Sequence, residues 1–286
     1  MFMDYLRIVI LGVVQGITEF LPISSDGHLA VANAIFSALS GEELPEDNLG
    51  VTIILHLGTL LAILIVYRQK IVRLLTQDRR IIPLLILGTI PAAATGLLLK
   101  KYFAHEMSSA LVAGCLLPLN GVMLLWISRR PQGDTPYEAI SYRQALSIGV
   151  CQAFAPLPGI SRSGTTIAGG LAVGVTREAA ATFSFMLAIP AIAGAGLLEL
   201  KDLITDGAAD MPAPSVLIVG AIVSFFVGWV SLLLLLRLLR EGRLAPLAWW
   251  CIGFGLAVIV WQLSSGGLEQ VTPTPVPTVA PAVAPA

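Results

Sequence analysis

The chain has 286 residues, of which 56% are hydrophobic and only 12% are charged, and its net charge at pH 7 is -1. A soluble domain carries about twice this charged fraction, so the composition excludes an ordinary soluble protein. Together with a mean hydropathy of +0.85, it indicates an integral membrane protein with several helices. The near-zero net charge argues against nucleic acid as a partner.

Two apolar regions are interrupted in their middle by proline, serine and glycine. The first covers about residues 5–39 and is broken at 22–27; the second covers about 145–175 and is broken at 156–164. A helix that breaks at membrane depth is tolerated where it is buried in protein or lines a cavity. We therefore predict that each region forms a re-entrant helical hairpin.

Six further apolar runs are long enough to cross a bilayer, which takes about 17 to 25 residues. Their approximate bounds are 51–67, 81–99, 110–127, 179–198, 215–236 and 247–263. We predict an all-α polytopic membrane protein with a single membrane domain over 1–263, made of repeat one (about 1–130) and repeat two (about 142–263). Each repeat holds one hairpin and three spans. Residues 264–286, rich in Pro and Ala, are predicted to be a disordered tail.

The distribution of basic residues predicts how the two repeats are oriented. Lys and Arg are enriched in cytoplasmic loops. With one hairpin and three spans per repeat, the loop after the first span and the other basic segments fall on one side, with Arg68, Lys70, Arg73, Arg79, Arg80, Arg129, Arg130, Arg143, Arg177, Arg237, Arg240 and Arg243. This bias places both termini outside. Because three spans is an odd number, the second repeat is inverted relative to the first.

The two hairpin regions also share sequence. When 15–28 is laid over 152–165 without gaps, Gln15 falls on Gln152, Ser24 on Ser161 and Gly27 on Gly164. Inverted repeats whose broken helices meet near the membrane midplane are a known architecture. We therefore expect an inverted-topology repeat in which the two breaks face each other.

The first hairpin carries groups suited to acid–base chemistry. Gln15 and Glu19 are four residues apart, so a helix places both on one face, and a carboxylate there can hold a divalent cation or act as a general base. Ser25, Asp26 and His28 follow at the break, where a helix restarts and where His28 is expected close to Ser25. These residues can simply cap the helix. The cost of polar groups at membrane depth favours a functional site instead.

The second hairpin carries groups suited to an anion. Its break has one arginine and several hydroxyls in a Gly-rich turn that opens a helix, where exposed N–H groups and the helix dipole favour negative charge. Arg162 adds a planar fork that matches phosphate oxygens; the alternative is that it extends to the membrane surface. The candidate phosphate-binding residues are Gly159, Ser161, Arg162, Ser163 and Thr166. A phosphate clamp opposite an acid–base set suits a phosphoanhydride.

Other polar and aromatic residues are assigned structural parts. His56 lies in the middle of the first span, where we favour a packed, hydrogen-bonded role over a catalytic one. Trp249, Trp250 and Trp261 lie near span ends and fit the aromatic belts of the membrane interface.

These motifs resemble the undecaprenyl-diphosphatases of the bacitracin-resistance type, integral membrane enzymes of bacterial cell-wall synthesis. The first family signature is Glu or Gln, three residues and Glu, followed by Ser-Ser-x-Gly-His; here it is Gln15, Glu19 and residues 24–28. The second, Pro-Gly-x-Ser-Arg-Ser-x-x-Thr, is matched at 158–166. The resemblance extends from the first residues to about Leu263. One departure is the aspartate at position 26, where the family usually has Ser or Thr.

The resemblance implies removal of the terminal phosphate of undecaprenyl diphosphate outside the bacterial cytoplasmic membrane, with Mg or Ca. It implies a polyprenyl diphosphate lipid as partner; a homodimer is a possible assembly. We assign catalysis to Glu19, Ser25, His28 and Arg162, with Ser25 or His28 as alternative nucleophiles. The metal is assigned to Gln15, Glu19 and Asp26. The competing hypothesis is a lipid-phosphate or ion transporter without hydrolysis, which an inverted repeat fits equally well.

Overall fold

The computed structural model describes residues 2–40, 49–206 and 212–264, and these residues form helices without any β-sheet. The predicted tail, apart from Ser264, lies outside the described residues. The helices are α1 Phe2–Phe20, α2 Ser25–Ser40, α3 Leu49–Val66, α4 Arg68–Thr76, α5 Ile81–Tyr102, α6 Ala104–Met107, α7 Ala110–Ser128, the 3-10 turn η1 Tyr137–Ala139, α8 Tyr142–Gln152, α9 Arg162–Ala172, α10 Arg177–Asp206, α11 Pro214–Arg240 and α12 Ala245–Ser264.

The predicted membrane spans coincide with long helices. Within the described residues, five helices (α5, α7, α10, α11 and α12) are long and apolar enough to cross a membrane, and α3 with α4 makes a sixth if this pair, bent by 69°, counts as one span. The all-α polytopic class is therefore confirmed. The loop predicted after the first span is instead largely α4, a short helix that buries Leu74 and exposes most of its polar side chains.

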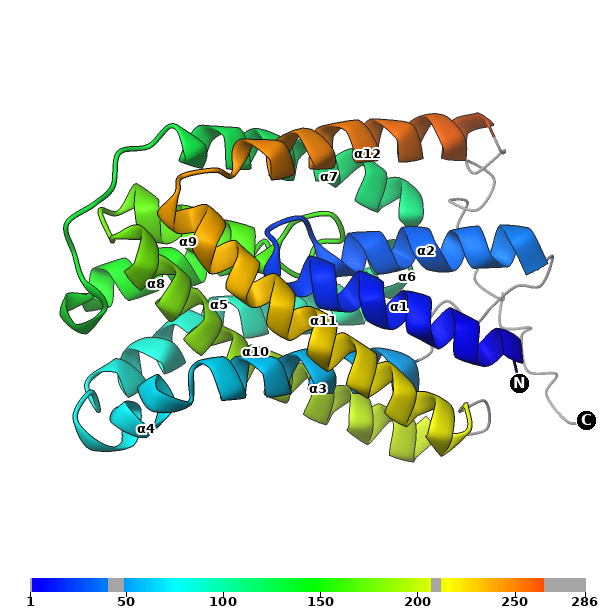
Figure 1. Cartoon of the computed structure of the whole chain (residues 1–286), viewed down its shortest axis with the longest axis horizontal. Coiled ribbons are helices and arrows are strands. Elements are labelled where there is room, and N and C mark those ends of the chain that lie inside the picture. Colours follow the sequence, from blue (N-terminus) through cyan, green and yellow to red (C-terminus); the bar gives the residue numbers. More distant parts are fainter. Residues whose placement is uncertain (1, 41–48, 207–211, 265–286) are drawn as a thin grey trace, which may run out of the picture.

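The two predicted hairpins enter the molecule from opposite ends. Figure 1 shows α1 and α2 on the side where the N-terminus lies, α8 and α9 at the opposite end, and the two breaks near the middle. The first break separates Phe20 from Ser25, and the second separates Gln152 from Arg162. Both breaks thus fall where proline and glycine interrupt the apolar pattern.

Helix packing is reciprocal between the two halves of the chain. Helix α1 of the first half packs on α11 of the second, and α8 of the second half packs on α5 of the first. In the same way, α3 packs on α10 and α7 packs on α12. The closest approaches repeat as well. A Cβ on Gly149 would lie 2.6 Å from the carbonyl oxygen of Gly88, and one on the equivalent Gly12 would lie 3.2 Å from that of Gly220. This exchange of partners supports the predicted repeat and explains why these helices need glycine at the crossing.

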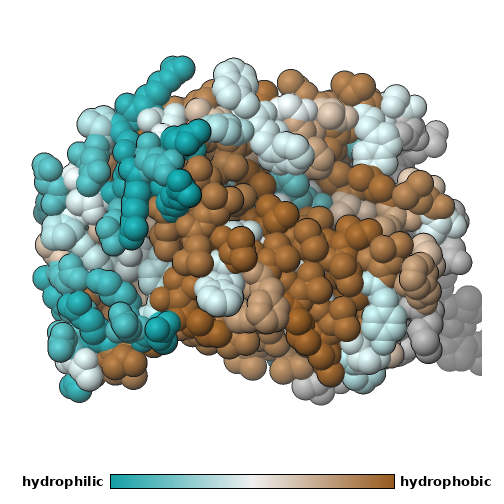
Figure 2. All heavy atoms as spheres, in the orientation of Figure 1, coloured by the Kyte–Doolittle hydropathy of each residue, from teal (hydrophilic) through white to brown (hydrophobic). Residues whose placement is uncertain are grey.

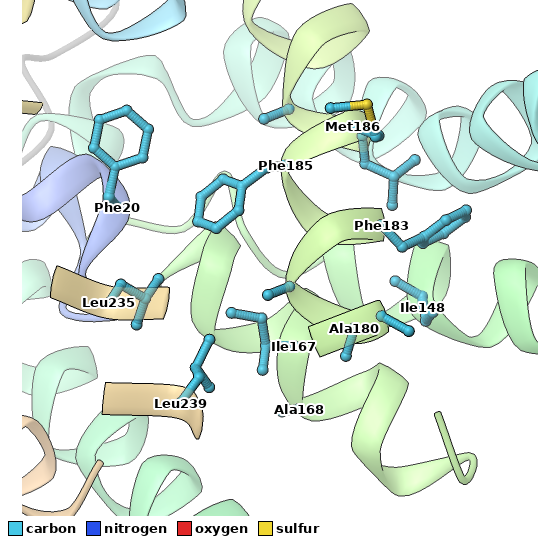
Figure 3. Close-up of a cluster of buried hydrophobic side chains, with 14 of the residues drawn as sticks. Phe20, Ile148, Ile167, Ala168, Ala180, Phe183, Phe185, Met186, Leu235 and Leu239 are labelled. Atoms are coloured by element: carbon cyan, nitrogen blue, oxygen red, sulfur yellow. The ribbon is translucent and has the colours of Figure 1, made fainter. Parts of the chain in front are cut away.

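The main cluster of buried hydrophobic residues lies around α10, next to the second hairpin. Figure 3 shows Phe183 and Phe185 of α10 among apolar side chains of α8, α9 and α11, with Phe20 from the end of α1 nearby. Both α10 phenylalanines and Phe20 are fully buried, and the rings of Phe20 and Phe185 lie 5.8 Å apart. The core therefore joins the end of α1 to α10, one residue away from Glu19.

The molecular surface divides into a charged end and an apolar body. Figure 2 shows hydrophilic residues gathered at the end where Figure 1 places α4, and a mostly hydrophobic surface over the middle of this face. At the charged end, Lys70 lies 3.1 Å from Glu138, and Arg73 lies 3.1 Å from Asp78. A hydrogen bond from the amide of Glu138 itself, and then the bond from Lys70, lower the pKa of the Glu138 carboxyl.

Candidate active site

The two helix breaks are bonded directly to each other. Ser24 adopts a φ of 75°, and its hydroxyl accepts hydrogen bonds from the N–H groups of Gly159, at 3.0 Å, and Gly27, at 3.3 Å. The side chain of Asn120, on α7, joins them a second time: it donates to the carbonyl of Pro22 at 2.8 Å and accepts from the N–H of Ser161 at 3.1 Å. The two breaks are therefore held together by hydrogen bonds that the side chains of Ser24 and Asn120 make.

The restarting helices are capped by equivalent serines. Ser161 precedes α9 and accepts a hydrogen bond from the N–H of Gly164 at 3.1 Å, as Ser24 does from Gly27. Such caps satisfy N–H groups that have no partner within the helix. Ser25 and Arg162 directly follow these caps. They are therefore the first residues of their helices, and both lie where the two breaks meet.

Glu19 is the centre of the site. It is 6% exposed, and its Oε1 accepts a 2.7 Å hydrogen bond from Nη2 of Arg162. Its Oε2 accepts from the hydroxyl of Ser25 at 2.8 Å and from the amide of Gln15 at 3.2 Å. Glu19 thus contacts two other residues of the first motif, Gln15 and Ser25, and one residue of the second motif, Arg162.

Arg162 points into the protein. Its Nη1 donates to the carbonyl of Ser184 at 3.3 Å, and its guanidinium lies 6.0 Å from the ring centre of Phe185. The side chain is 15% exposed. An arginine that reached for the membrane surface would not be held from both sides in this way, so the structure contradicts that alternative.

His56 is closer to the site than the sequence analysis expected. Its Nδ1 lies 2.9 Å from the carbonyl of Thr52, as a packed histidine would, but its Nε2 also lies 3.7 Å from Oε2 of Glu19. The available signal was its position in the middle of an apolar span, where an ionisable side chain is costly. Asn120 and Ser184 were missed because neither belongs to a motif.

His28 lies near Ser25 through the backbone, because its ring bonds the carbonyl of Ser24, which directly precedes Ser25. Its two ring nitrogens contact the carbonyl of Ser24, 2.8 Å from Nδ1, and the indole N–H of Trp250, which donates to Nε2 at 3.0 Å. Among the described residues, no hydrogen bond joins the ring to Glu19 or Arg162. Trp250, expected only as part of an interfacial belt, is therefore a direct partner of a motif residue.

The hydroxyls of the second motif hold α9 together. Ser161 and Ser163 face each other at 3.1 Å between their Oγ atoms. The hydroxyl of Thr166, which is fully buried, lies 2.7 Å from the carbonyl of Arg162 and 2.6 Å from the hydroxyl of Ser184. The N–H of Gly159 is donated to Ser24. Arg162 is thus the motif residue best placed to meet a phosphate, and the geometry gives the others a supporting part.

The metal expected from the resemblance has a partial ligand set here. Oε1 of Gln15 is buried and without a hydrogen-bond partner, next to the carboxylate of Glu19. Asp26 is exposed on the first turn of α2. No group of three or more His, Cys, Asp and Glu side chains within the described ranges could hold a metal ion. Two oxygens fit a Mg ion that takes its other ligands from phosphate and water.

Comparison with known proteins identifies the family. Residues 8–257 match the family described as bacitracin resistance protein BacA. An undecaprenyl-diphosphatase of Rhodopirellula baltica is 46% identical over 260 residues, which are 91% of this chain and 99% of that protein. The undecaprenyl-diphosphatases of Methanosphaera stadtmanae and Desulforapulum autotrophicum are 37% and 38% identical over 281 residues, covering 90% of this chain and 98% of each relative. The chain belongs to the bacitracin resistance protein BacA family.

Proposed function

We propose that this membrane protein hydrolyses undecaprenyl diphosphate to undecaprenyl phosphate and inorganic phosphate. The relatives are named for this activity, and the match to this chain covers nearly their whole length. The observation that carries the proposal is the contact of Glu19 with both Ser25 and Arg162, which places a base, a hydroxyl and a phosphate-binding fork together. The reaction recycles the lipid carrier of peptidoglycan synthesis and confers resistance to bacitracin in a bacterial cytoplasmic membrane.

Ser25 is the nucleophile in the proposed mechanism. Its hydroxyl already donates to Oε2 of Glu19 at 2.8 Å, so the carboxylate can take the proton as Oγ attacks the terminal phosphorus. The bond from that phosphorus to the bridging oxygen breaks, and undecaprenyl phosphate leaves. Water then hydrolyses the phosphoserine and regenerates Ser25. His28 is a weaker nucleophile candidate, because both of its ring nitrogens are engaged elsewhere.

Arg162 binds the phosphate through its planar fork. At rest, one terminal nitrogen is on Glu19 and the other on the carbonyl of Ser184. An incoming diphosphate competes with Glu19 for this guanidinium, which frees the carboxylate to act on Ser25. A divalent cation, when bound, would be held by Gln15 and Glu19 and would neutralise phosphate charge. Asp26, exposed on the first turn of α2, would offer an additional oxygen.

The site opens to the outer face in this proposal. The basic residues at the α4 end are typical of a cytoplasmic side, which puts the N-terminal end of α1 and the C-terminal end of α2 outside. The first hairpin then enters from outside and the second from inside, as an inverted repeat requires. The exposure of Asp26 and the partial exposure of Ser25 support access from the first hairpin.

A transporter without hydrolysis is not favoured. Binding and moving an anion needs Arg162 but no carboxylate in contact with a serine hydroxyl, and the relatives carry the name of a diphosphatase. Purified protein in detergent should release inorganic phosphate from undecaprenyl diphosphate, and the Ser25→Ala variant should not. If the wild type releases none, but vesicles containing it take up the intact lipid, the hydrolase proposal is wrong.

A further inference from the structure

The ring of His28 is held at both nitrogens by partners of opposite chemistry. His28 is 7% exposed and lies one turn into α2. A backbone carbonyl can only accept a hydrogen bond, and an indole N–H can only donate one. The 2.8 Å contact with the carbonyl of Ser24 therefore places a proton on Nδ1, and the 3.0 Å contact with Trp250 leaves Nε2 without one. The partners fix the tautomer, and neither nitrogen is directed at Glu19.

Two aromatic rings of α12 fix the plane of this imidazole. Phe254 stacks on His28 with ring centres 4.7 Å apart and planes 9° apart. Trp250 lies nearly parallel to both, 5.4 Å from Phe254 and 6.3 Å from His28. Because α12 belongs to the second half of the chain, this stack reaches across the molecule to hold a side chain of the first hairpin.

The carbonyl that His28 bonds belongs to Ser24, the residue whose side chain links the two helix breaks. Among the described residues, Ser24 is the non-glycine residue with a positive φ, a conformation that L-residues adopt only when their surroundings hold them there. Its hydroxyl bonds Gly159, and its carbonyl begins the peptide that leads into Ser25. Rotation of that peptide would carry the Ser25 hydroxyl away from Glu19. The 2.8 Å bond from Nδ1 opposes this rotation, in addition to the 3.3 Å bond from the backbone N–H of His28 to the same carbonyl.

We propose that His28 is a positioning residue, held by Trp250 and Phe254, that fixes the peptide between Ser24 and Ser25 so that the Ser25 hydroxyl stays on Glu19. The inference rests on the proposed function, because it assigns His28 a part in that reaction. It separates His28 from proton transfer and from attack on phosphorus. The three rings and the strained serine act as one support for the nucleophile.

Two substitutions of His28 distinguish positioning from chemistry. The amide nitrogen of asparagine sits where Nδ1 sits and can donate to Ser24, whereas glutamine carries its amide further out, near Nε2. We expect His28→Asn to keep kcat/KM within about tenfold, the scale of the one hydrogen bond lost to Trp250. We expect His28→Gln to lose about 10²-fold, the scale of a misplaced reacting group. The loss should fall in kcat, because Arg162 still binds the phosphate.

The inference is wrong if the two His28 variants behave alike. If both variants fold and neither turns over, the ring itself does chemistry; if both remain within tenfold, the contact with Ser24 does not matter. Each variant is compared with wild type for elution and thermal stability in detergent.

A spectroscopic test is independent of activity. The chain has 3 histidines, so the ¹⁵N signals of labelled protein can be assigned by single substitutions. We expect His28 to show the tautomer protonated at Nδ1, and Trp250→Phe to change its signals and lower kcat severalfold. Trp249→Phe, the exposed neighbour on α12, should change neither. A ring protonated at Nε2 contradicts the inference even if the variants of His28 do not fold. If wild type releases no phosphate, the proposed function fails while this test still reports on the contact.

Discussion

Arg162 and Glu19 come from opposed hairpins and meet in an ion pair, with Nη2 of the arginine 2.7 Å from Oε1 of the carboxylate. Both side chains are largely buried, at 15% and 5% exposure. Each residue is therefore the resting partner of the other, although one is assigned to the phosphate and the other to the proton. In the proposed mechanism, an incoming diphosphate competes with Glu19 for the guanidinium.

Replacing Arg162 with lysine tests the planar fork. Lysine keeps the charge but cannot make the bonds to Glu19, Ser184 and a phosphate with one rigid group. We expect Arg162→Lys to insert and fold but to lose at least about 10²-fold in kcat/KM, the scale of one lost charge-stabilising donor. Ser163→Ala, one residue on, is the matched control and should cost less. A lysine variant within a few-fold of wild type would remove the clamp from the mechanism.

Replacing Glu19 with glutamine tests the proton acceptor. Glutamine can still accept a bond from Arg162 or Ser25 but cannot take the serine proton. We expect phosphate release to fall by about 10²- to 10⁴-fold, as for loss of a general base. In a double-mutant cycle, Glu19→Gln and Arg162→Lys should be strongly non-additive, because the two side chains share one ion pair. Additive losses would mean that they act separately.

Gln15 tests the partial metal site. Its Oε1 is buried without a partner beside Glu19, so Gln15→Leu should raise the Mg concentration needed for half-maximal activity by about tenfold or more, the range found for loss of groups around a metal. Gln15→Glu should be tolerated, because it supplies an oxygen and the resembling family uses either residue. Activity is measured against Mg after removal of divalent cations with a chelator. An unchanged Mg requirement in Gln15→Leu would exclude this oxygen as a ligand.

The close crossing of α8 and α5 predicts a stability difference between two glycines. A Cβ on Gly149 would meet the carbonyl of Gly88 at 2.6 Å, whereas a Cβ on Gly96 would have its nearest neighbour, Pro156, at 3.8 Å. Gly149→Ala should therefore destabilise by about 1–3 kcal/mol, as overpacking does. Gly96→Ala should be neutral or slightly stabilising, because alanine is the better helix former. Melting in detergent gives both values, and equal Tm shifts would contradict the crossing.

The orientation is tested with reporters. A reporter fused after Ser264 should report the outer side of the membrane, and one inserted near Gly133 should report the cytoplasm. Gly133 lies between α7 and η1, and Ser264 is the last residue of α12, so each fusion is first checked for retained phosphate release. Reports from the same side would mean that the second repeat is not inverted relative to the first.

Much of the architecture is readable from the sequence because it depends on local pattern. Proline and glycine within apolar regions mark both breaks, and the spacing of Gln15 and Glu19 places them on one face. The single arginine of the second motif is recognisable because a charge at this depth needs a partner. These signals act over a few residues, and the structure bears out where each break falls.

The contacts that complete the site are not readable in this way. Asn120 bonds residues 98 and 41 positions away, and Trp250 bonds a histidine 222 positions away. Neither contact has a local signature, because both depend on how α7 and α12 cross the hairpins. The place of His28 on the first turn does not reveal that its ring also contacts α12, where Trp250 donates to it and stacks on it together with Phe254.

The bonds between the two breaks also set an order of events during synthesis. Ser24 leaves the ribosome well before its partner Gly159, which is 135 residues further along the chain. Until Gly159 and Asn120 are made, the hydroxyl of Ser24 lacks its second donor and the carbonyl of Pro22 lacks the side chain that donates to it in the folded protein. Polar groups without hydrogen-bond partners are costly in lipid, so we expect the newly made hairpin to stay at the hydrated membrane surface. We expect the hairpin to pack inside only after the second motif has been made, more than halfway along the chain, when Gly159 and Arg162 become available.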